Sequence, residues 1–555
     1  MIKSIRTAAP VAVGVALILA AFATASPAQQ QPSAESQSPQ AEQREQQQQA
    51  PPPRAARNAD RNADRSTDRS DRDRDDDGDR IAHDEKVTKD RIVTTTHSVN
   101  IGGQTVNYTA RTGFLVLKDD DGTPRASFFF TAYTKNGADP ATRPVTYTFN
   151  GGPGSSSVWL HMGAFGPRRV VYRDDEGRAA APPYKLVDNE DSLLDITDLV
   201  FIDPVTTGFS RAIPFKDAKR FHGVEADIES VGEFIRLWTT RYGRWASPKF
   251  LAGESYGTTR AAGLSGWLQE QGLYVNGIVL LSTVLNFQTS RFDTGNDLPY
   301  ILFLPTYASI AWYHKQLPAD LQAMPVAQVA AEAERFALGD YTNALMKGDR
   351  LTDAEHTAIA KQLARLTGLS QQYVEQSNLR IRIDRFDKEL LRRQRRTVGR
   401  LDGRFVGYDR DAAGESPDYD PSYAAIMGEY TAVLNDYVRR ELKLETDLPY
   451  EILTDKVRPW SYDKASNRYV DVGETLRDAM TQNPFLKVFV ANGYYDLATP
   501  FAATNYTFSR MQLEPEIRSN LSMDYFEGGH MMYIDRKAHA RLKKDIGEFM
   551  KRAVE

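Results

Sequence analysis

Residues 249–258 read KFLAGESYGT, and this short stretch decides the fold. Lys249–Ala252 is typical of a buried strand, and Thr258–Gln269 has the apolar spacing of a helix. The residues between them match Gly-x-Ser-x-Gly, the pattern of a sharp strand-to-helix turn that exposes a serine. Glycines suit this turn because a side chain at either position would collide with neighbouring backbone. We therefore predict that Ser255 is a nucleophile at the start of a helix, where partial positive charge stabilises an oxyanion.

Strands and helices alternate on both sides of this turn. Apolar patterns predict further strands at Val145–Phe149, Leu199–Ile202, Ile278–Leu281 and Val488–Val490. Helices are predicted at Glu225–Trp238 and Ala538–Val554. Strand patterns also cover Val99–Tyr108, Gly113–Val116 and Ala126–Tyr133, and the turn residues 119–122 between the last two indicate a hairpin. The alternation predicts an α/β fold with a mostly parallel central sheet flanked by helices.

The segment 286–455 interrupts this alternation and carries mainly helical patterns. Helices are predicted at Pro318–Phe336, Thr352–Thr367 and Tyr423–Leu442. A long insertion late in such a sheet usually covers the carboxyl ends of the strands, where ligands bind. We therefore expect a helical cap inserted between two parts of the core, residues 81–285 and 456–555.

The N-terminal 80 residues have a different composition. Residues 1–25 predict a signal peptide, because Lys3 and Arg6 precede the apolar run Val11–Phe22 and small residues follow it. A retained membrane anchor is the alternative, although the run is shorter than the ~20 residues that span a bilayer. Residues 26–80 are rich in Gln and Pro and then in Arg and Asp, which predicts a disordered linker. A charged handle for the cell envelope is the alternative. We expect an exported protein, periplasmic or extracellular, with no membrane span after cleavage.

Composition narrows the possible chemistry. The 555 residues carry a net charge of −5, which gives no reason to expect a nucleic-acid partner. The absence of cysteine removes any thiol nucleophile and any thiolate metal site. The acidic cluster at 409–420 lacks the glycine and glutamate spacing of a calcium loop. We predict neither a metal nor a cofactor, and the sequence leaves the oligomeric state open.

A serine nucleophile needs a base, and two motifs near the C-terminus supply the partners. In this kind of fold the chain order is serine, then acid, then histidine. Asp496 follows the predicted strand Val488–Val490, and His530 stands in the glycine-rich stretch 527–531. His530 would take the proton from Ser255, and Asp496 would orient the imidazole. Asp524 and Asp535 are rival acids, but residues this close in sequence to a histidine rarely reach its far ring nitrogen.

A second glycine motif follows the predicted strand Val145–Phe149. Residues 150–157 read NGGPGSSS. Glycines there allow backbone N–H groups to approach a reacting carbonyl, so we predict an oxyanion loop. A phosphate-binding loop is the alternative, but the motif lacks the Gly-Lys-Ser/Thr ending that cradles phosphate.

Taken together, five sequence blocks resemble the serine carboxypeptidase family of the α/β-hydrolase fold. They are residues 150–157, Asp203-Pro204 with Gly208-Phe209-Ser210, Gly253–Gly257, Asn492-Gly493 with Asp496, and Gly529-His530-Met531. The blocks occur in the family's order over roughly residues 100–550, and the cap segment is unmatched. The resemblance implies hydrolysis of C-terminal peptide bonds through an acyl-enzyme on Ser255. It also implies a peptide partner with a free C-terminus, and we expect a secreted bacterial member.

The resemblance assigns further roles. Gly152 and Tyr256 would donate the oxyanion-hole N–H groups, and Asn150 and Glu254 would bind the substrate's terminal carboxylate. A turn residue ordering its own loop is the alternative for Asn150, and an unremarkable motif position is the alternative for Glu254.

The chain departs from the family at two positions. Ser155 stands where members usually have cysteine, and Ala164 stands where many have glutamate. The second change weakens the expected carboxylate-binding network. An esterase, acyl hydrolase or acyltransferase of the same fold therefore remains an alternative. An inactive peptide-binding relative is a third, which the complete set Ser255, Asp496 and His530 argues against.

Overall fold

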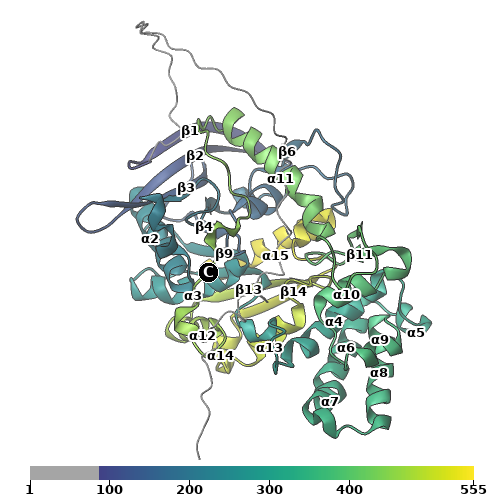
Figure 1. Ribbon diagram of the computed structural model, residues 1–555. Helices are drawn as coiled ribbons and strands as arrows, with labels where there is room; N and C mark the ends of the chain where they lie inside the picture. The colour runs from purple at the N-terminus through teal and green to yellow at the C-terminus, as the bar shows by residue number, and fades with distance from the viewer. Residues whose placement is uncertain (1–86) are drawn as a thin grey trace, which may run out of the picture. The chain divides into compact units, whose positions relative to one another are not determined.

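The structure, a computed structural model, describes residues 87–555 (Figure 1). The predicted signal peptide and the whole of the predicted linker, residues 1–80, lie outside the described residues. A ten-stranded sheet forms the centre, with the order β1-β2-β3-β7-β4-β9-β10-β13-β14 and β8 paired to β3. Its strands are β1 Arg91–Ile101, β2 Gln104–Lys118, β3 Pro124–Lys135, β4 Val145–Phe149, β7 Asp198–Ile202, β8 Arg211–Ala212, β9 Lys249–Ser255, β10 Gly277–Thr283, β13 Lys487–Gly493 and β14 Leu521–Phe526.

Strands β7, β4, β9, β10, β13 and β14 run parallel to one another, while β1, β2 and β3 pair antiparallel beside β7. Parallel strands end at one edge of a sheet, so the residues that follow β4, β9, β13 and β14 gather there. The prediction of a mostly parallel central sheet is confirmed, and the hairpin at residues 119–122 joins β2 to β3.

Alternate residues along the parallel strands pack on opposite faces of the sheet. Phe250 and Ala252 of β9 contribute to one core cluster, whereas Leu251 contributes to the other. The first face packs against α11 (Pro421–Arg440) and α15 (Arg536–Val554). The second packs against α2 (Val224–Arg241), α3 (Tyr256–Glu270) and α12 (Gly473–Gln482). Helices therefore cover both faces, as the alternation of sequence patterns predicted.

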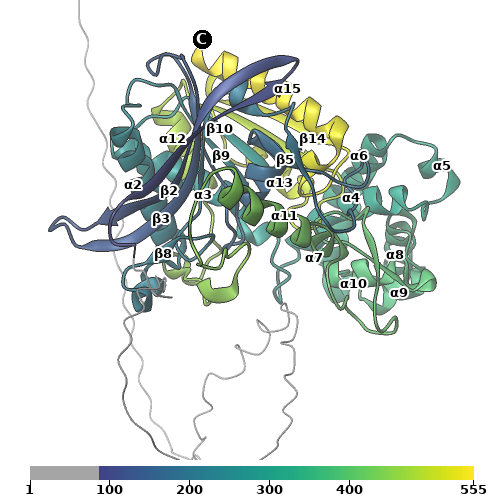
Figure 2. The same ribbon diagram turned by 90° about the horizontal axis from the view of Figure 1, so that it is seen from above.

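The segment between β10 and β13 carries a further group of helices, which Figures 1 and 2 both place beside β14. They are α4 Leu298–Tyr313, α5 Ala319–Gln322, α6 Val326–Phe336, α7 Thr342–Lys347, α8 Asp353–Thr367, α9 Gln371–Gln376 and α10 Ile383–Glu389. A short hairpin, β11 Arg396–Val398 and β12 Val406–Tyr408, leads on to α11. These helices share a core cluster that also contains Tyr495 and Leu497, the two neighbours of Asp496.

Three predicted elements were wrong in their extent. The strand predicted over Gly113–Val116 is only the middle of β2, which continues without a break from Gln104 to Lys118. The strand predicted over Val99–Tyr108 is broken by a turn at Gly102 and Gly103, whose φ values of 56° and 81° are open to glycine at little cost. The helix predicted over Pro318–Phe336 is two helices. Pro325 caps α6, and the residue before a proline is disfavoured in the helical region.

The remaining elements are short or flank the core. They include β5 Arg168–Val170, β6 Leu186–Asp188, α13 Phe501–Ser509, α14 Pro515–Arg518, the π-helix η2 Leu160–Phe165 and the 3₁₀ helix η11 Met532–Ile534. Within residues 87–555, the helices are all too short or too polar to cross a membrane.

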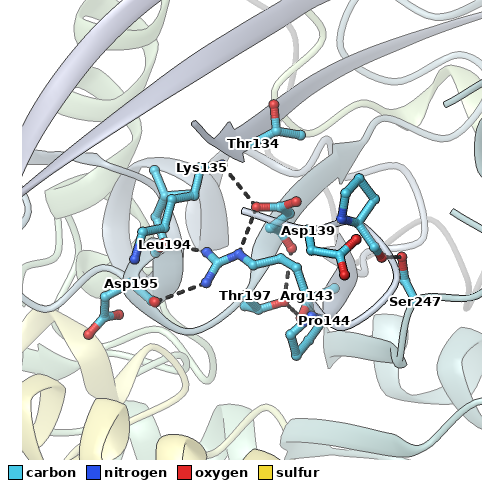
Figure 3. A network of polar contacts seen from close by, with 12 residues as sticks. Thr134, Lys135, Asp139, Arg143, Pro144, Leu194, Asp195, Thr197 and Ser247 are labelled. Carbon is cyan, nitrogen blue, oxygen red and sulfur yellow. Dashed lines mark hydrogen bonds and ion pairs between the residues drawn. The ribbon is translucent and has the colours of Figure 1, made fainter. Parts of the chain in front are cut away.

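A buried ionic network fastens the amino ends of β4 and β7, opposite the edge where the loops gather. Figure 3 shows the Arg143 guanidinium bonded to the carbonyls of Leu194 and Asp195. Arg143 also donates to Asp198 Oδ1 at 3.1 Å, and Arg244 donates to the other carboxylate oxygen at 2.6 Å. Both ions of each pair are almost fully buried, so each needs its partner to remain charged.

Candidate active site

The predicted nucleophile stands at the junction of β9 and α3. Ser255 is the last residue of the strand, and its φ of 60° and ψ of −131° are rarely adopted outside glycine. A Cβ on Gly253 would lie 2.2 Å from the carbonyl oxygen of Gly257, and one on Gly257 would lie 2.8 Å from that of Phe149. Neither position has room for a side chain. The half-buried Ser255 is thus presented at the amino end of α3.

Asp496 and His530 are brought together by the parallel strands β13 and β14. His530 Nδ1 lies 2.8 Å from Asp496 Oδ2. Asp496 Oδ1 accepts from the backbone N–H groups of Ala498 and Thr499, and Oδ2 also accepts from the Thr499 hydroxyl at 2.7 Å. Three donors besides the imidazole hold this carboxylate, which in turn fixes the orientation of the imidazole. With Nδ1 occupied, His530 has Nε2 left for a reacting group.

Electrostatics favour protonation of this histidine. Burial lowers the pKa of His530, but the Asp496 carboxylate and then Glu254 raise it, and the net pKa lies above its ordinary value. The charged form of His530 is therefore stabilised by its acidic neighbours Asp496 and Glu254. In the part of the chain that the structure describes, no hydrogen bond joins Ser255 to His530. Such a bond often forms only in a substrate complex.

The predicted oxyanion loop lies against the first turn of α3. A Cβ on Gly151 would lie 2.4 Å from the backbone nitrogen of Tyr256, and Gly152 has a φ of 101°. This approach places the two predicted N–H donors, Gly152 and Tyr256, in neighbouring parts of the backbone. Arg260, one helical turn after Tyr256, donates to the carbonyl of Asn150 at 2.6 Å and holds the loop from behind.

Glu254 and Asn150 form a buried polar pair beside the nucleophile. Asn150 Nδ2 donates to Glu254 Oε1 at 3.1 Å, and Asn150 Oδ1 accepts from the backbone N–H of Leu160. The Tyr533 hydroxyl donates to the other oxygen of Glu254 at 2.5 Å. Burial raises the pKa of Glu254 to about 7. Near neutral pH this carboxyl therefore exists in both protonation states.

Ser155 and Ala164, the two positions that depart from the family pattern, make different kinds of contact. Ser155 accepts a hydrogen bond from Trp159 Nε1 at 2.9 Å and pairs through its backbone with Leu453. Ala164 lies buried in η2, where its carbonyl accepts from Asn189 Nδ2 at 2.9 Å and from His539 Nε2 at 2.7 Å. The backbone of residue 164 is therefore tied to its surroundings without an acidic side chain.

The block around Asp203 supports the far end of the oxyanion loop. Asp203 Oδ1 accepts from the backbone N–H and the hydroxyl of Ser157 at 2.8 and 2.7 Å. Burial raises the pKa of Asp203 to about 6. A Cβ on Gly208 would lie 1.7 Å from Asp203 Oδ2, so only glycine fits there. Ser210 closes the turn by donating to the carbonyl of Asp203 at 2.6 Å.

The segment after β11 contacts the loops that carry Asp496 and His530 through its backbone. The N–H of His530 donates to the carbonyl of Leu401 at 2.6 Å. The N–H of Gly403 donates to the carbonyl of Tyr495, and that of Leu497 donates to the carbonyl of Arg400. The segment 400–403 thus lies beside the loops that carry Asp496 and His530.

Sequence reasoning missed several residues that build this site. Tyr533 follows His530 by three positions, and neither its type nor its spacing matched a motif. Arg260 and its partner Asp227 lie on different helices, 33 residues apart. Only the charge of Arg260 within the otherwise small and apolar predicted helix 258–269 could have drawn attention to it. Within residues 87–555, no group of three or more His, Asp or Glu side chains is placed to hold a metal ion.

Comparison with known proteins agrees with this geometry. Residues 102–272 match the family described as serine carboxypeptidase. Serine carboxypeptidase-like 33 of Arabidopsis thaliana is 32% identical over 133 residues, which cover 23% of this chain and 26% of that protein. Carboxypeptidase Y of Saccharomyces cerevisiae is 29% identical over 154 residues, 27% of this chain and 25% of that protein. The matches to these two relatives thus span about a quarter of their length.

A solved structure extends the similarity in fold to most of the chain. It is Kex1(delta)p, a prohormone-processing carboxypeptidase from Saccharomyces cerevisiae. The TM-score is 0.50 at 15% identity, over 80% of this chain and 91% of that one. At this identity the likeness concerns the fold alone. The chain therefore has the α/β-hydrolase fold, and its residues 102–272 match the serine carboxypeptidase family.

Proposed function

We propose that this protein is a serine carboxypeptidase that removes C-terminal residues from peptides through an acyl-enzyme on Ser255. The observation that carries the proposal is the buried pair of Asn150 and Glu254, joined at 3.1 Å directly beside the nucleophile. Hydrolysis of a simple ester needs no such pair, whereas a C-terminal carboxylate must be bound in competition with water. The match of residues 102–272 to the serine carboxypeptidase family supports the same choice.

The pair suits a carboxylate for a specific reason. Asn150 uses one amide hydrogen on Glu254, so its second hydrogen is left for a substrate. Protonated Glu254 can donate a hydrogen bond to a carboxylate, whereas ionised Glu254 repels it. With its pKa raised to about 7 by burial, Glu254 is protonated in acidic to neutral solution.

The chemical steps follow from the positions of the side chains. Ser255 Oγ attacks the scissile carbonyl carbon while His530 Nε2 accepts its proton. The oxyanion that forms accepts hydrogen bonds from the N–H groups of Gly152 and Tyr256. His530 then donates its proton to the leaving amine, and the C–N bond breaks. Water, deprotonated by His530, attacks the acyl-enzyme, and the return of the proton to Ser255 completes the cycle.

We propose a peptide with a free C-terminus as the substrate, no metal or cofactor, and neither a nucleic-acid partner nor a retained membrane span. Export to the periplasm or the cell exterior is proposed from the apolar run Val11–Phe22 behind Lys3 and Arg6. A bacterial origin stays a prediction, because the two relatives described above come from a plant and a yeast.

The test is to incubate the purified protein with a peptide library and identify the products by mass spectrometry. Stepwise loss of single C-terminal residues is the expected result, with Ser255→Ala as the inactive control. Cleavage of acyl esters but not of peptides would favour an esterase or acyltransferase. Failure of a fluorophosphonate to label Ser255 in the folded protein would favour an inactive peptide-binding relative.

A further inference from the structure

Tyr533 is the one tyrosine in the described chain whose hydroxyl donates to Glu254. Its oxygen lies 2.5 Å from Glu254 Oε2. It stands in η11, three residues after His530, and is almost fully buried. Burial raises the pKa of Tyr533 well above its ordinary value, so the phenol stays protonated and acts as a hydrogen-bond donor at any working pH.

The ring of Tyr533 packs against Gly163, the residue before Ala164. Gly163 leaves room for two tyrosine side chains, since a Cβ on it would lie 2.8 Å from the Tyr533 ring and 2.2 Å from the Tyr430 hydroxyl. Two tyrosines, one from α11 and one from η11, therefore occupy the room beside this small-residue stretch. The Tyr430 hydroxyl bonds to that of Tyr172 at 2.6 Å, whereas the Tyr533 hydroxyl bonds to Glu254.

The groups that act on Glu254 come from several elements. Asp496 raises its pKa, and Tyr430 of α11 lies close enough to interact with it electrostatically. His530 and the hydrogen bonds from Tyr533 and Asn150 lower the pKa, against the larger effect of burial. Tyr533 differs from His530 because its phenol neither gains nor loses a proton near neutral pH, so it donates to Glu254 throughout that range.

Building on the carboxypeptidase function proposed above, we infer that Tyr533 is a positioning residue for Glu254. It fixes the carboxyl against Asn150 and sets the upper pH limit for binding a peptide's terminal carboxylate. A donor that always points at Glu254 stabilises the ionised form, which repels the substrate. The tyrosine therefore confines carboxypeptidase action to lower pH than burial of Glu254 alone would allow.

The experiment compares kcat/KM against pH for an N-blocked dipeptide and for its C-terminal amide, in wild type and in Tyr533→Phe. The alkaline fall in dipeptide cleavage should move up by about one to two pH units, the worth of a hydrogen bond to a charged group. The amide carries no carboxylate and should keep its alkaline profile. Tyr430→Phe removes a hydroxyl that bonds to Tyr172 and makes no hydrogen bond to Glu254, so it should move the dipeptide profile much less than Tyr533→Phe does.

The outcomes separate this inference from the proposed function. If kcat/KM of the wild type depends on pH in the same way for the dipeptide and the amide, Glu254 does not bind the terminal carboxylate, and the proposed function is refuted. Suppose instead that the two wild-type profiles differ. An alkaline fall that stays at the same pH in Tyr533→Phe would then overturn the role of Tyr533 alone. So would an equal loss of kcat/KM for both substrates at every pH. If Tyr533→Phe does not fold, 3-fluorotyrosine at position 533 provides a stronger donor of nearly equal size. This substitution should shift the alkaline fall in dipeptide cleavage to lower pH, and an unshifted fall would overturn the inference.

Discussion

Arg260 joins α3, the helix that follows Ser255, to the loop that begins at Asn150, because its Nη1 donates to the backbone carbonyl of Asn150 at 2.6 Å. The other guanidinium nitrogens donate to the two oxygens of Asp227 on α2, at 2.8 and 3.1 Å. Both side chains are almost fully buried. An ion pair between α2 and α3 therefore supports the loop 150–157, the predicted oxyanion loop.

Breaking this pair should affect both stability and catalysis. Asp227→Asn leaves a buried arginine without its counter-ion, so we expect the free energy of unfolding to fall by about 3–5 kcal/mol. The loop held by Arg260 should loosen, and kcat/KM should fall on the order of 10-fold or more. Urea unfolding and steady-state kinetics measure the two effects.

Asp198→Asn is the matched control, since Asp198 pairs with Arg143 and Arg244 at the amino ends of the strands. It should lower stability by a similar amount and leave kcat/KM of the folded protein unchanged. Equal kinetic losses in both variants would show that Arg260 has no particular role at the loop.

Substitutions in the proposed triad should separate chemistry from folding. We expect Ser255→Ala and His530→Ala each to lower kcat on the order of 10⁴-fold or more, and Asp496→Asn somewhat less. The fold should persist, because Ser255 is the last residue of β9 and His530 lies in the loop after β14, beyond the paired residues of that strand. Circular dichroism and single-turnover kinetics check the two parts. Near-normal turnover in His530→Ala would mean that another group is the base.

A methyl group on Gly151 should damage the oxyanion hole. Its Cβ would lie 2.4 Å from the nitrogen of Tyr256 and 2.8 Å from that of Gly257, and backbone atoms have little room to move. The loop must shift, so Gly151→Ala should lower kcat about 10²–10³-fold, as the loss of one oxyanion donor does. Gly547→Ala on α15 is the control, since its nearest neighbour would lie at an ordinary 3.6 Å. An active Gly151→Ala enzyme would place the oxyanion donors elsewhere.

The elements that local patterns could predict are those with a strict geometry. The Gly-x-Ser-x-Gly turn needs two glycines at fixed spacing, and short apolar runs identify the central strands, which are buried on both faces. The turn at Gly102 and Gly103 was missed because strand patterns continue on both sides of it. Tyr533 was missed for a different reason. Its role depends on the space beside Gly163, 370 positions earlier in the chain, and a pattern confined to one segment cannot show which distant residues share that space.

If Glu254 binds the substrate's terminal carboxylate, as proposed, activity should depend on pH in a specific way. His530 must be neutral to act as a base, and its pKa lies above its ordinary value, so cleavage of any substrate should rise as pH increases through that pKa. Glu254 must be protonated to bind a carboxylate, and burial raises its pKa to about 7, so cleavage of a free-C-terminal dipeptide should fall above about pH 7. Dipeptide activity should therefore pass through a maximum, whereas activity on the C-terminal amide should reach a plateau.

Glu254→Gln keeps a hydrogen-bond donor and never ionises, so the alkaline fall should disappear for the dipeptide. The measurement is kcat/KM from pH 4 to 9 for both substrates and both proteins, and a persistent alkaline fall in Glu254→Gln would assign it to a group other than Glu254.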